Sequence, residues 1–166
     1  MNETYVECLV ACKKNPIFSV LKYVLYGFAI ACVLMAFLGV FALFLLAILF
    51  AGAGYLVAPL ADIEYEYLYL DKEISIDKVI AKQRRKRVMS IDLNKAEIFA
   101  PSNSHSLDSY RNRQHVEKNF SSGSEDAKTY TVVFSDKEQM QLVTIEPNEE
   151  MIRAIKMVFP RKVVEY

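Results

Sequence analysis

The fold of this chain is decided by YVLYGFAIACVLMAFLGVFALFLLAILFAGAGYLVAPLA, residues 23–61, in which no residue is charged. A charge at the centre of a bilayer is costly, and roughly 20 apolar residues cross the hydrocarbon core. One straight helix over this stretch would be about 58 Å long, well beyond a core of about 30 Å. The stretch therefore predicts two transmembrane helices joined by a tight turn, and hence an integral membrane protein.

We expect this helical hairpin over residues 17–60, with the first span from Ile17 to about Ala36 and the second from about Val40 to Ala58. The turn is placed around Gly39, the only glycine near the midpoint. A cleaved signal peptide is a poor alternative, because its apolar region normally has only about 7–15 residues. The apolar run is therefore interpreted as a retained membrane anchor.

Basic residues set the expected orientation of the hairpin. Lys13, Lys14 and Lys22 come before the apolar run, the turn has no lysine or arginine, and a second basic stretch follows at residues 82–87. Cytoplasmic flanks of membrane proteins carry the excess of lysine and arginine. Both termini are therefore expected in the cytoplasm.

The chain changes character at Asp62, after which it carries most of its charge. In IEYEYLYL the hydropathy alternates with a period of two and places Tyr65, Tyr67 and Tyr69 on one face. Similar patterns predict strands in EISIDKVI, VMSIDL, AEIFA, TYTVVF and QLVTI, the last two as a hairpin. We therefore expect residues 61–166 to form a small domain built on an antiparallel sheet or barrel.

The two ends of the chain carry different sequence patterns. Residues 1–16 are treated as a separate juxtamembrane segment, in which periodicity does not decide between a strand and a helix for YVECLV. At the other end, PNEEMIRAIKMVFP predicts a helix with Asn148 as N-cap and two glutamates in the first turn. The stripe expected to close the sheet consists of Met151, Ile152, Ile155, Val158 and Phe159.

This order of strands followed by one amphipathic helix is similar to that of the bacterial pleckstrin-homology-like (PH-like) domains, which often follow transmembrane hairpins. The similarity covers Asp62 to about Phe159 and implies an α+β fold capped by a C-terminal helix. A closer resemblance extends over nearly the whole chain and rests on YVECLV, IEYEYLYLDKEISIDK, KRV, APSNSHSLDSY and PNEEM. These segments resemble an uncharacterised family, a domain of unknown function, of small two-span bacterial membrane proteins. The resemblance implies a bacterial inner-membrane location and supplies no activity, substrate or catalytic residue.

The strongest charge cluster is KQRRKR, residues 82–87. Basic side chains near a membrane favour anionic headgroups by about 1 kcal/mol each. The plainer alternative is a solvated hairpin tip whose charges prevent edge-to-edge strand pairing. Nucleic-acid binding is disfavoured, because the chain is neutral and no aromatic residue is interleaved with the basic ones. The candidate residues for binding a lipid or partner are Lys82, Arg84, Arg85, Lys86 and Arg87.

The polar stretch over residues 102–128 is expected to be a long loop, either functional or mobile. It contains Ser104, His105 and Asp108, but catalytic triads are defined by geometry and not by proximity in sequence. No G-x-S-x-G elbow, P-loop, dinucleotide fingerprint or metal motif occurs in the sequence. Turn-forming hydrogen bonds explain this composition directly. We therefore expect no catalytic residue, cofactor or metal.

Together these patterns favour a non-enzymatic, membrane-anchored interaction or scaffold protein. Its expected partners are the lipid bilayer, anionic headgroups and an unidentified membrane or cytoplasmic protein, and a homo-oligomer is left open. Two alternatives remain: an enzyme that uses residues 102–130, and an accessory subunit of a channel or transporter. Residues 23–58 contain no charged residue and no histidine, which favours anchoring over transport.

Overall fold

The structure is a computed structural model that describes residues 5–13, 16–136 and 139–164. The chain divides into two compact units. The first, called the domain below, consists of residues 1–13, 64–79 and 85–166. The second, called the hairpin unit, consists of residues 14–63 and 80–84. Each unit combines segments that are distant in the sequence.

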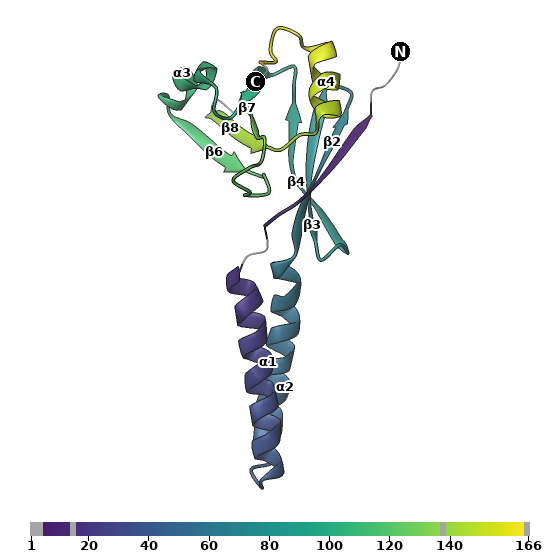
Figure 1. Ribbon diagram of the computed structural model, residues 1–166, viewed down its shortest axis with the longest axis vertical. Helices are drawn as coiled ribbons and strands as arrows, with labels where there is room; N and C mark the ends of the chain where they lie inside the picture. Colours follow the sequence, from purple (N-terminus) through teal and green to yellow (C-terminus); the bar gives the residue numbers. More distant parts are fainter. Residues whose placement is uncertain (1–4, 14–15, 137–138, 165–166) are drawn as a thin grey trace. The chain divides into compact units, whose positions relative to one another are not determined.

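The hairpin unit is built on two antiparallel helices (Figure 1), α1 (Pro16–Phe37) and α2 (Leu43–Val57). The 3₁₀ turn η1 (Ala58–Ala61) continues α2, so two helical stretches of 22 and 19 residues are long and apolar enough to cross a bilayer. Gly39 lies in the turn with a φ of +109°, a conformation that disfavours a β-carbon. The predicted two-helix arrangement, including the position of the turn, is confirmed.

Small residues allow α1 and α2 to approach each other closely. A β-carbon at Gly54 would lie 2.9 Å from Cε1 of Tyr26, whereas one at Gly52 would meet nothing within 4 Å. Most large apolar side chains of both helices are exposed, which forms the kind of surface that suits lipid. The buried small residues of the two helices are Ala29, Ala36, Ala47 and Gly54.

The first sheet of the domain has the strand order β1-β2-β3-β4. Its strands are β1 (Val6–Ala11), β2 (Ile63–Leu70), β3 (Glu73–Ile80) and β4 (Arg84–Asp92). The N-terminal segment, whose structure the sequence leaves open, is therefore a strand. It pairs antiparallel with β2, with Val6 opposite Tyr69 and Ala11 opposite Glu64. The segment that precedes the helices thus supplies an edge strand to the sheet that follows them.

The second sheet has the order β5-β7-β8-β6. Its strands are β5 (Ala96–Pro101), β7 (Tyr130–Asp136), β8 (Gln139–Ile145) and β6 (His115–Asn119). The predicted hairpin of β7 and β8 is present, whereas β6 pairs parallel to β8.

The stretch over residues 102–128 is more ordered than the expected long loop. Besides β6 it contains the 3₁₀ turn η2 (His105–Leu107) and the single helical turn α3 (Asp108–Arg111). Leu107 is fully buried in a small apolar cluster with Val133 and Leu142. Burial of this leucine against the second sheet explains why the stretch is held in place.

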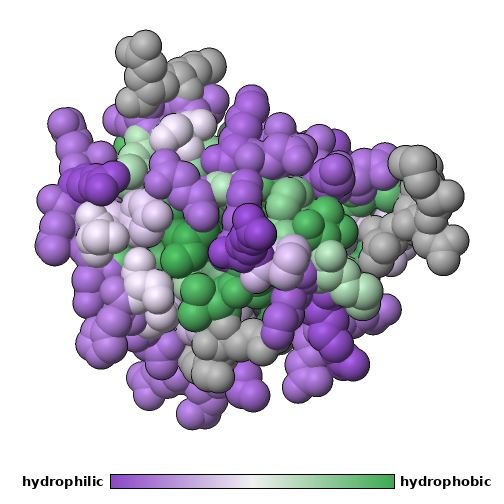
Figure 2. Space-filling view, turned by 90° about the horizontal axis from the view of Figure 1, so that it is seen from above, coloured by the Kyte–Doolittle hydropathy of each residue, from purple (hydrophilic) through white to green (hydrophobic). Residues whose placement is uncertain are grey.

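The main core lies between the two sheets and includes side chains from the C-terminal helix α4 (Glu149–Val158). Tyr67 and Tyr69 are fully buried in it, as the alternation of β2 predicts, and the Tyr67 hydroxyl donates to the carbonyl oxygen of Phe120 at 2.7 Å. Figure 2 shows one surface of the molecule, where hydrophilic side chains surround a small central group of hydrophobic ones.

Helix α4 closes the core much as its sequence predicts. The side-chain oxygen of Asn148 accepts a hydrogen bond from the backbone N–H of Met151 at 2.8 Å, which confirms the N-cap. Met151 and Ile155 are fully buried. Val158 is 39% exposed, so its assignment to the buried stripe is wrong. The chain leaves helical geometry at Phe159, whose ring packs against the core in its place.

Candidate functional site

The predicted basic cluster is divided between different parts of the structure. Lys82 lies in the turn between β3 and β4, and Arg84 is the first residue of β4; both belong to the hairpin unit. Arg85, Lys86 and Arg87 follow within β4 and belong to the domain. All five side chains are exposed, but they do not share one set of neighbours.

Arg85 forms a bidentate ion pair with Glu66 on the outer face of the first sheet. Its Nε and one terminal nitrogen lie 2.9 Å from the two carboxylate oxygens of Glu66. The side chain of Glu66 is 1% exposed, whereas that of Arg85 is 58% exposed. The terminal nitrogen of Arg85 donates a charge-assisted hydrogen bond to Oε1 of Glu66, whereas Oε2 is within ion-pair distance of Nε but accepts no hydrogen bond from the described residues. Much of the charge of Arg85 is therefore already compensated within the domain.

Arg87 is compensated in a similar way by Asp77 of β3, with Nε and Oδ1 3.1 Å apart. Further along β4, the hydroxyl of Ser90 donates to Glu73, also of β3. Arg87 and Ser90 of β4 thus both contact carboxylates of β3.

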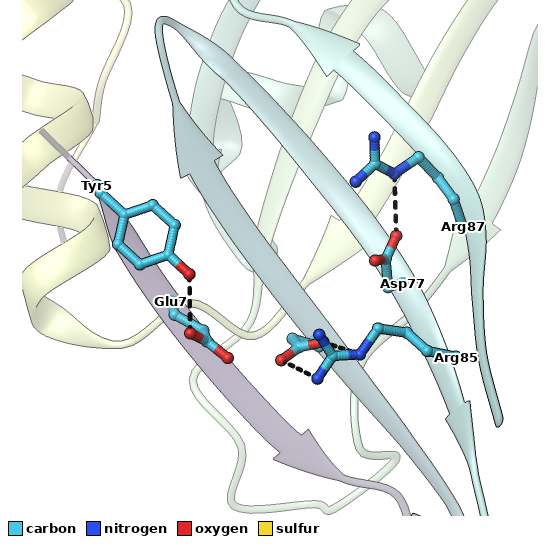
Figure 3. Close-up of polar contacts among 6 residues, drawn as sticks. Tyr5, Glu7, Asp77, Arg85 and Arg87 are labelled. Atoms are coloured by element: carbon cyan, nitrogen blue, oxygen red, sulfur yellow. Dashed lines mark hydrogen bonds and ion pairs between the residues drawn. The ribbon is translucent and has the colours of Figure 1, made fainter. Parts of the chain in front are cut away.

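Tyr5 and Glu7 add a further hydrogen bond on this same face (Figure 3). The hydroxyl of Tyr5 donates to Oε2 of Glu7 at 2.9 Å, and the carboxyl groups of Glu7 and Glu66 affect the pKa of each other. Burial, followed by the hydrogen bond with Glu7, raises the pKa of Glu66 to about 7, although Arg85 opposes the shift. The hydrogen bonds with Glu66 and Tyr5 lower the pKa of Glu7.

These side chains form a connected polar surface on β1 to β4, which we call the charged face. Leu9 of β1 and Tyr5 just before it add apolar and aromatic area, since both are more than half exposed. The charged face can bind polar groups, and the raised pKa of Glu66 allows it to exchange a proton near neutral pH. Its members are Tyr5, Glu7, Glu66, Asp77, Arg85 and Arg87.

The polar residues of the stretch 102–128 mostly make local, structural hydrogen bonds. His105 Nδ1 lies 3.1 Å from Asp108 Oδ2, but the imidazole is fully exposed. The hydroxyl of Ser104 accepts from the backbone N–H of Ser106 and caps η2. The hydroxyl of Ser102 contacts that of Thr131 at 3.0 Å. These serines are therefore used in turn and strand contacts and do not converge on His105.

Sequence reasoning did not single out Glu7, Glu66 or Asp77 as site residues. In the sequence they are explained by strand alternation, since Glu7 and Glu66 each lie between residues that face the core and Asp77 follows the core residue Ile76. The signal that could have found Glu66 is its position in the middle of an apolar, tyrosine-rich strand, where a buried carboxylate needs a cationic partner.

Two sheets packed around one core and closed by a C-terminal helix define the class of this domain as PH-like. The chain belongs to the family described as Bacterial PH-like domain (DUF6106), which matches residues 2–165 and is of unknown function. The match includes the two apolar helices as well as the domain. No curated protein and no solved structure matches the chain.

Proposed function

We propose that this chain is a non-enzymatic interaction protein that is anchored in the bacterial inner membrane and presents its PH-like domain to a protein partner in the cytoplasm. The observation that carries the proposal is the pairing of β1 with β2, which are adjacent in one sheet although the two apolar helices separate them in sequence. A soluble domain would gain nothing from an exposed apolar hairpin inserted between two neighbouring strands.

The same pairing supports a topology in which both ends of the hairpin emerge on one side of the bilayer. The strands that lead into and out of the hairpin hydrogen-bond to each other, with Ala11 opposite Glu64, and cannot do so across a membrane. Lysine and arginine residues flank the helices on this side, while the turn around Gly39 has none. This bias supports a cytoplasmic position for the domain.

The charged face is the surface that we propose for the partner. Tyrosine and arginine are enriched in protein interfaces, and partly exposed ion pairs can add specificity at their rim. Tyr5 and Leu9 supply exposed aromatic and apolar area beside the two arginines. In contrast, the polar stretch 102–128 offers neither a buried base nor a converging nucleophile, which favours an interaction role over catalysis.

Topology is tested by cysteine accessibility in intact cells, starting from a chain in which the native cysteines are replaced by serine. A cysteine at Leu38, in the turn between the helices, should react with a membrane-impermeant maleimide added outside. A cysteine at Glu125, in the domain, should react only after the cells are lysed. Labelling at Glu125 in intact cells would reverse the proposed orientation, and protection of both positions would contradict the hairpin.

The partner surface is tested by photo-crosslinking in native membranes. A photoreactive amino acid at Leu9 should give a discrete adduct with one protein, identified by mass spectrometry, whereas one at Glu125 should give none. An adduct of twice the chain mass would identify a second copy as the partner. Absence of any adduct at Leu9, Tyr5 and Arg87 alike would remove the charged face as the interaction surface.

A further inference from the structure

The hairpin unit contains a cavity of about 750 Å³ at the end of the helices where the chain enters and leaves them. Side chains of α1, the end of α2, η1 and the turn between β3 and β4 form its walls, and all of them belong to this one unit. The lining combines apolar residues with a few charged ones. The charged residues are Lys22, Asp62 and Arg84.

Two cations of the cavity lack an anionic partner in the described part of the chain. Lys22 is half-buried on α1, its Nζ lies 4.6 Å from the centroid of the Tyr23 ring, and it makes no ion pair with any described residue. Arg84 is exposed and makes no ion pair with any described residue. Asp62 supplies the one carboxylate of the lining. The cavity therefore carries a net charge of about +1 and suits a monoanion.

Arg84 thus differs from the next arginine along the strand. Arg85 is held in a bidentate ion pair by Glu66, and Arg87 is paired with Asp77. An anion that approached these two arginines would compete with existing carboxylates, but one that entered the cavity would not. Of the basic residues predicted to bind lipid, Arg84 is the one that lines the cavity together with Lys22.

The walls of the cavity are fixed by backbone hydrogen bonds. The N–H of Ala81 donates to the carbonyl oxygen of Asp62 at 2.8 Å, and the N–H of Asp62 donates to that of Pro59 at 3.2 Å. The first of these bonds ties the β3–β4 turn, and with it Arg84, to the segment that leaves α2. The backbone that carries Arg84 is therefore held beside the segment that leaves α2.

The position of the cavity along the chain matches the depth of lipid headgroups. Lys22 is the last charged residue before the apolar run, and Asp62 is the first one after it. Tyr23 and Tyr55 line the same cavity, and tyrosines are enriched where membrane helices meet the headgroup layer. The apolar part of the lining, which includes Leu56 and Leu60, suits the glycerol and upper acyl region of a lipid.

From these features we infer that the cavity is a binding site for an anionic phospholipid whose phosphodiester headgroup carries a hydroxyl. Arg84 donates parallel hydrogen bonds to two phosphate oxygens, Lys22 adds a second cation, and Asp62 accepts a hydrogen bond from the headgroup hydroxyl. A zwitterionic lipid is a poorer match, because its net charge is zero. The inference rests on the proposed membrane anchoring and adds to it a defined lipid ligand.

The test is native mass spectrometry of the purified full chain in detergent, titrated with phosphatidylglycerol. Lys22→Gln combined with Arg84→Gln should weaken binding at least tenfold, whereas Lys86→Gln, which removes an exposed basic residue outside the cavity, should change it less than twofold. Equal weakening by the control would mean that only overall charge matters and would overturn the site. Circular dichroism spectra identical to that of the unmodified chain establish that the variants are folded.

Three further ligands separate the sources of the phosphate group. Phosphatidylethanolamine should bind at least fivefold more weakly than phosphatidylglycerol, and glycerol 1-phosphate at millimolar concentration should not displace the lipid. Displacement by glycerol 1-phosphate would replace the lipid with a soluble phosphate compound. Phosphatidylmethanol, which has the same charge but no headgroup hydroxyl, should bind more weakly to the unmodified chain and equally well to Asp62→Ala. An unchanged preference in this variant would remove the role of Asp62.

Extraction with alkaline carbonate tests the membrane anchor separately from the headgroup site. A chain that is extracted from membranes by alkaline carbonate would contradict the anchor itself. A chain that stays in the membrane pellet but binds all lipids equally would leave the anchor intact and overturn only the headgroup site.

Discussion

Glu66 is a buried acidic residue whose side chain is 1% exposed and lies against Arg85. Burial and the neighbouring Glu7 raise the pKa of its carboxyl group to about 7, although the ion pair with Arg85 opposes the shift. In the unfolded chain a glutamate titrates near 4.3. Between these values the folded domain binds a proton that the unfolded chain has released. The contribution of Glu66 to stability is therefore fully present below about pH 4.3 and is lost as the pH rises through about 7.

Replacement of Glu66 by glutamine should flatten the dependence of stability on pH. The free energy of unfolding of the unmodified chain in detergent, measured by denaturant titration, is expected to fall between pH 5 and pH 8. Glu66→Gln should reduce this decline, because the amide does not titrate, while Glu97→Gln on an exposed strand position should leave it unchanged. A decline of the same size in all three proteins would show that Glu66 is not its source.

The turn between β3 and β4 contains an alanine in the left-handed region of backbone conformations. Ala81 has a φ of +50° without the side-chain compensation that asparagine or aspartate offers. Ala81→Gly should therefore raise the unfolding free energy by about 0.5–1 kcal/mol. Ala96→Gly, at a strand position, should lower it by a similar amount. Thermal unfolding followed by circular dichroism measures both, and a loss of stability at both positions would contradict the strain at Ala81.

The sequence predicts the inner face of β2 but not its outer one. Tyr65, Tyr67 and Tyr69 follow from alternation alone, because any sheet with one buried face collects them. The pairing of Glu66 depends in addition on the order of the strands and on the register between them. Neither can be derived from local patterns, since register is set by long-range contacts. The sequence therefore predicts the arginines of the charged face but not the carboxylates that pair with them.

Among the elements, α4 shows how local signals and packing agree. Its N-cap, first-turn glutamates and apolar spacing are all encoded within a few residues, and each has the expected structural role. The stretch 102–128 behaves differently, because η2, α3 and β6 are too short to produce a periodic pattern. Their positions depend on the burial of Leu107 and on the parallel pairing of β6 with β8.

A charge introduced into the buried face of α4 should be severely destabilising. Ile155→Asp places a carboxylate among residues of both sheets and should cost about 3 kcal/mol or more. Met157→Asp introduces the same charge at a position that is 80% exposed and should cost less than about 1 kcal/mol. The melting temperatures of the two variants should therefore differ clearly. Equal values would mean that α4 does not close the core.

The helix pair offers a comparable contrast between two glycines of α2. Gly54→Leu should separate α1 from α2, because even a β-carbon there approaches Tyr26, whereas Gly52→Leu points into open space. Lower thermal stability in detergent is expected for the first variant alone. Cross-linking of cysteines at Phe28 and Phe50, whose rings stack with centroids 5.6 Å apart, gives a direct readout of the contact between the helices. An unchanged yield in Gly54→Leu would show that the small residue is not needed.

At the scale of the whole molecule, the domain is assembled from segments on both sides of the helix pair. Residues 62–166 alone lack β1, and with it the buried Val6 and Cys8 of the main core. Because Ala11 lies opposite Glu64, a short glycine–serine linker can connect residues 5–13 directly to residues 62–166. This linked protein should be soluble and unfold cooperatively, whereas residues 62–166 alone should melt at a much lower temperature or aggregate. Equal stability of the two would mean that β1 is dispensable.

The placement of β1 before the helices also determines when the molecule can finish folding during its synthesis. The ribosome delivers this strand first, at roughly 5–20 residues per second, but its partner β2 emerges only after the entire helix pair. Until then β1 has no neighbour, and the two helices must turn around before the strands can meet. The first sheet is thus completed only when the helix pair is inserted correctly. A chain that enters the bilayer in the wrong orientation keeps an unpaired sheet edge, which quality-control proteases can recognise.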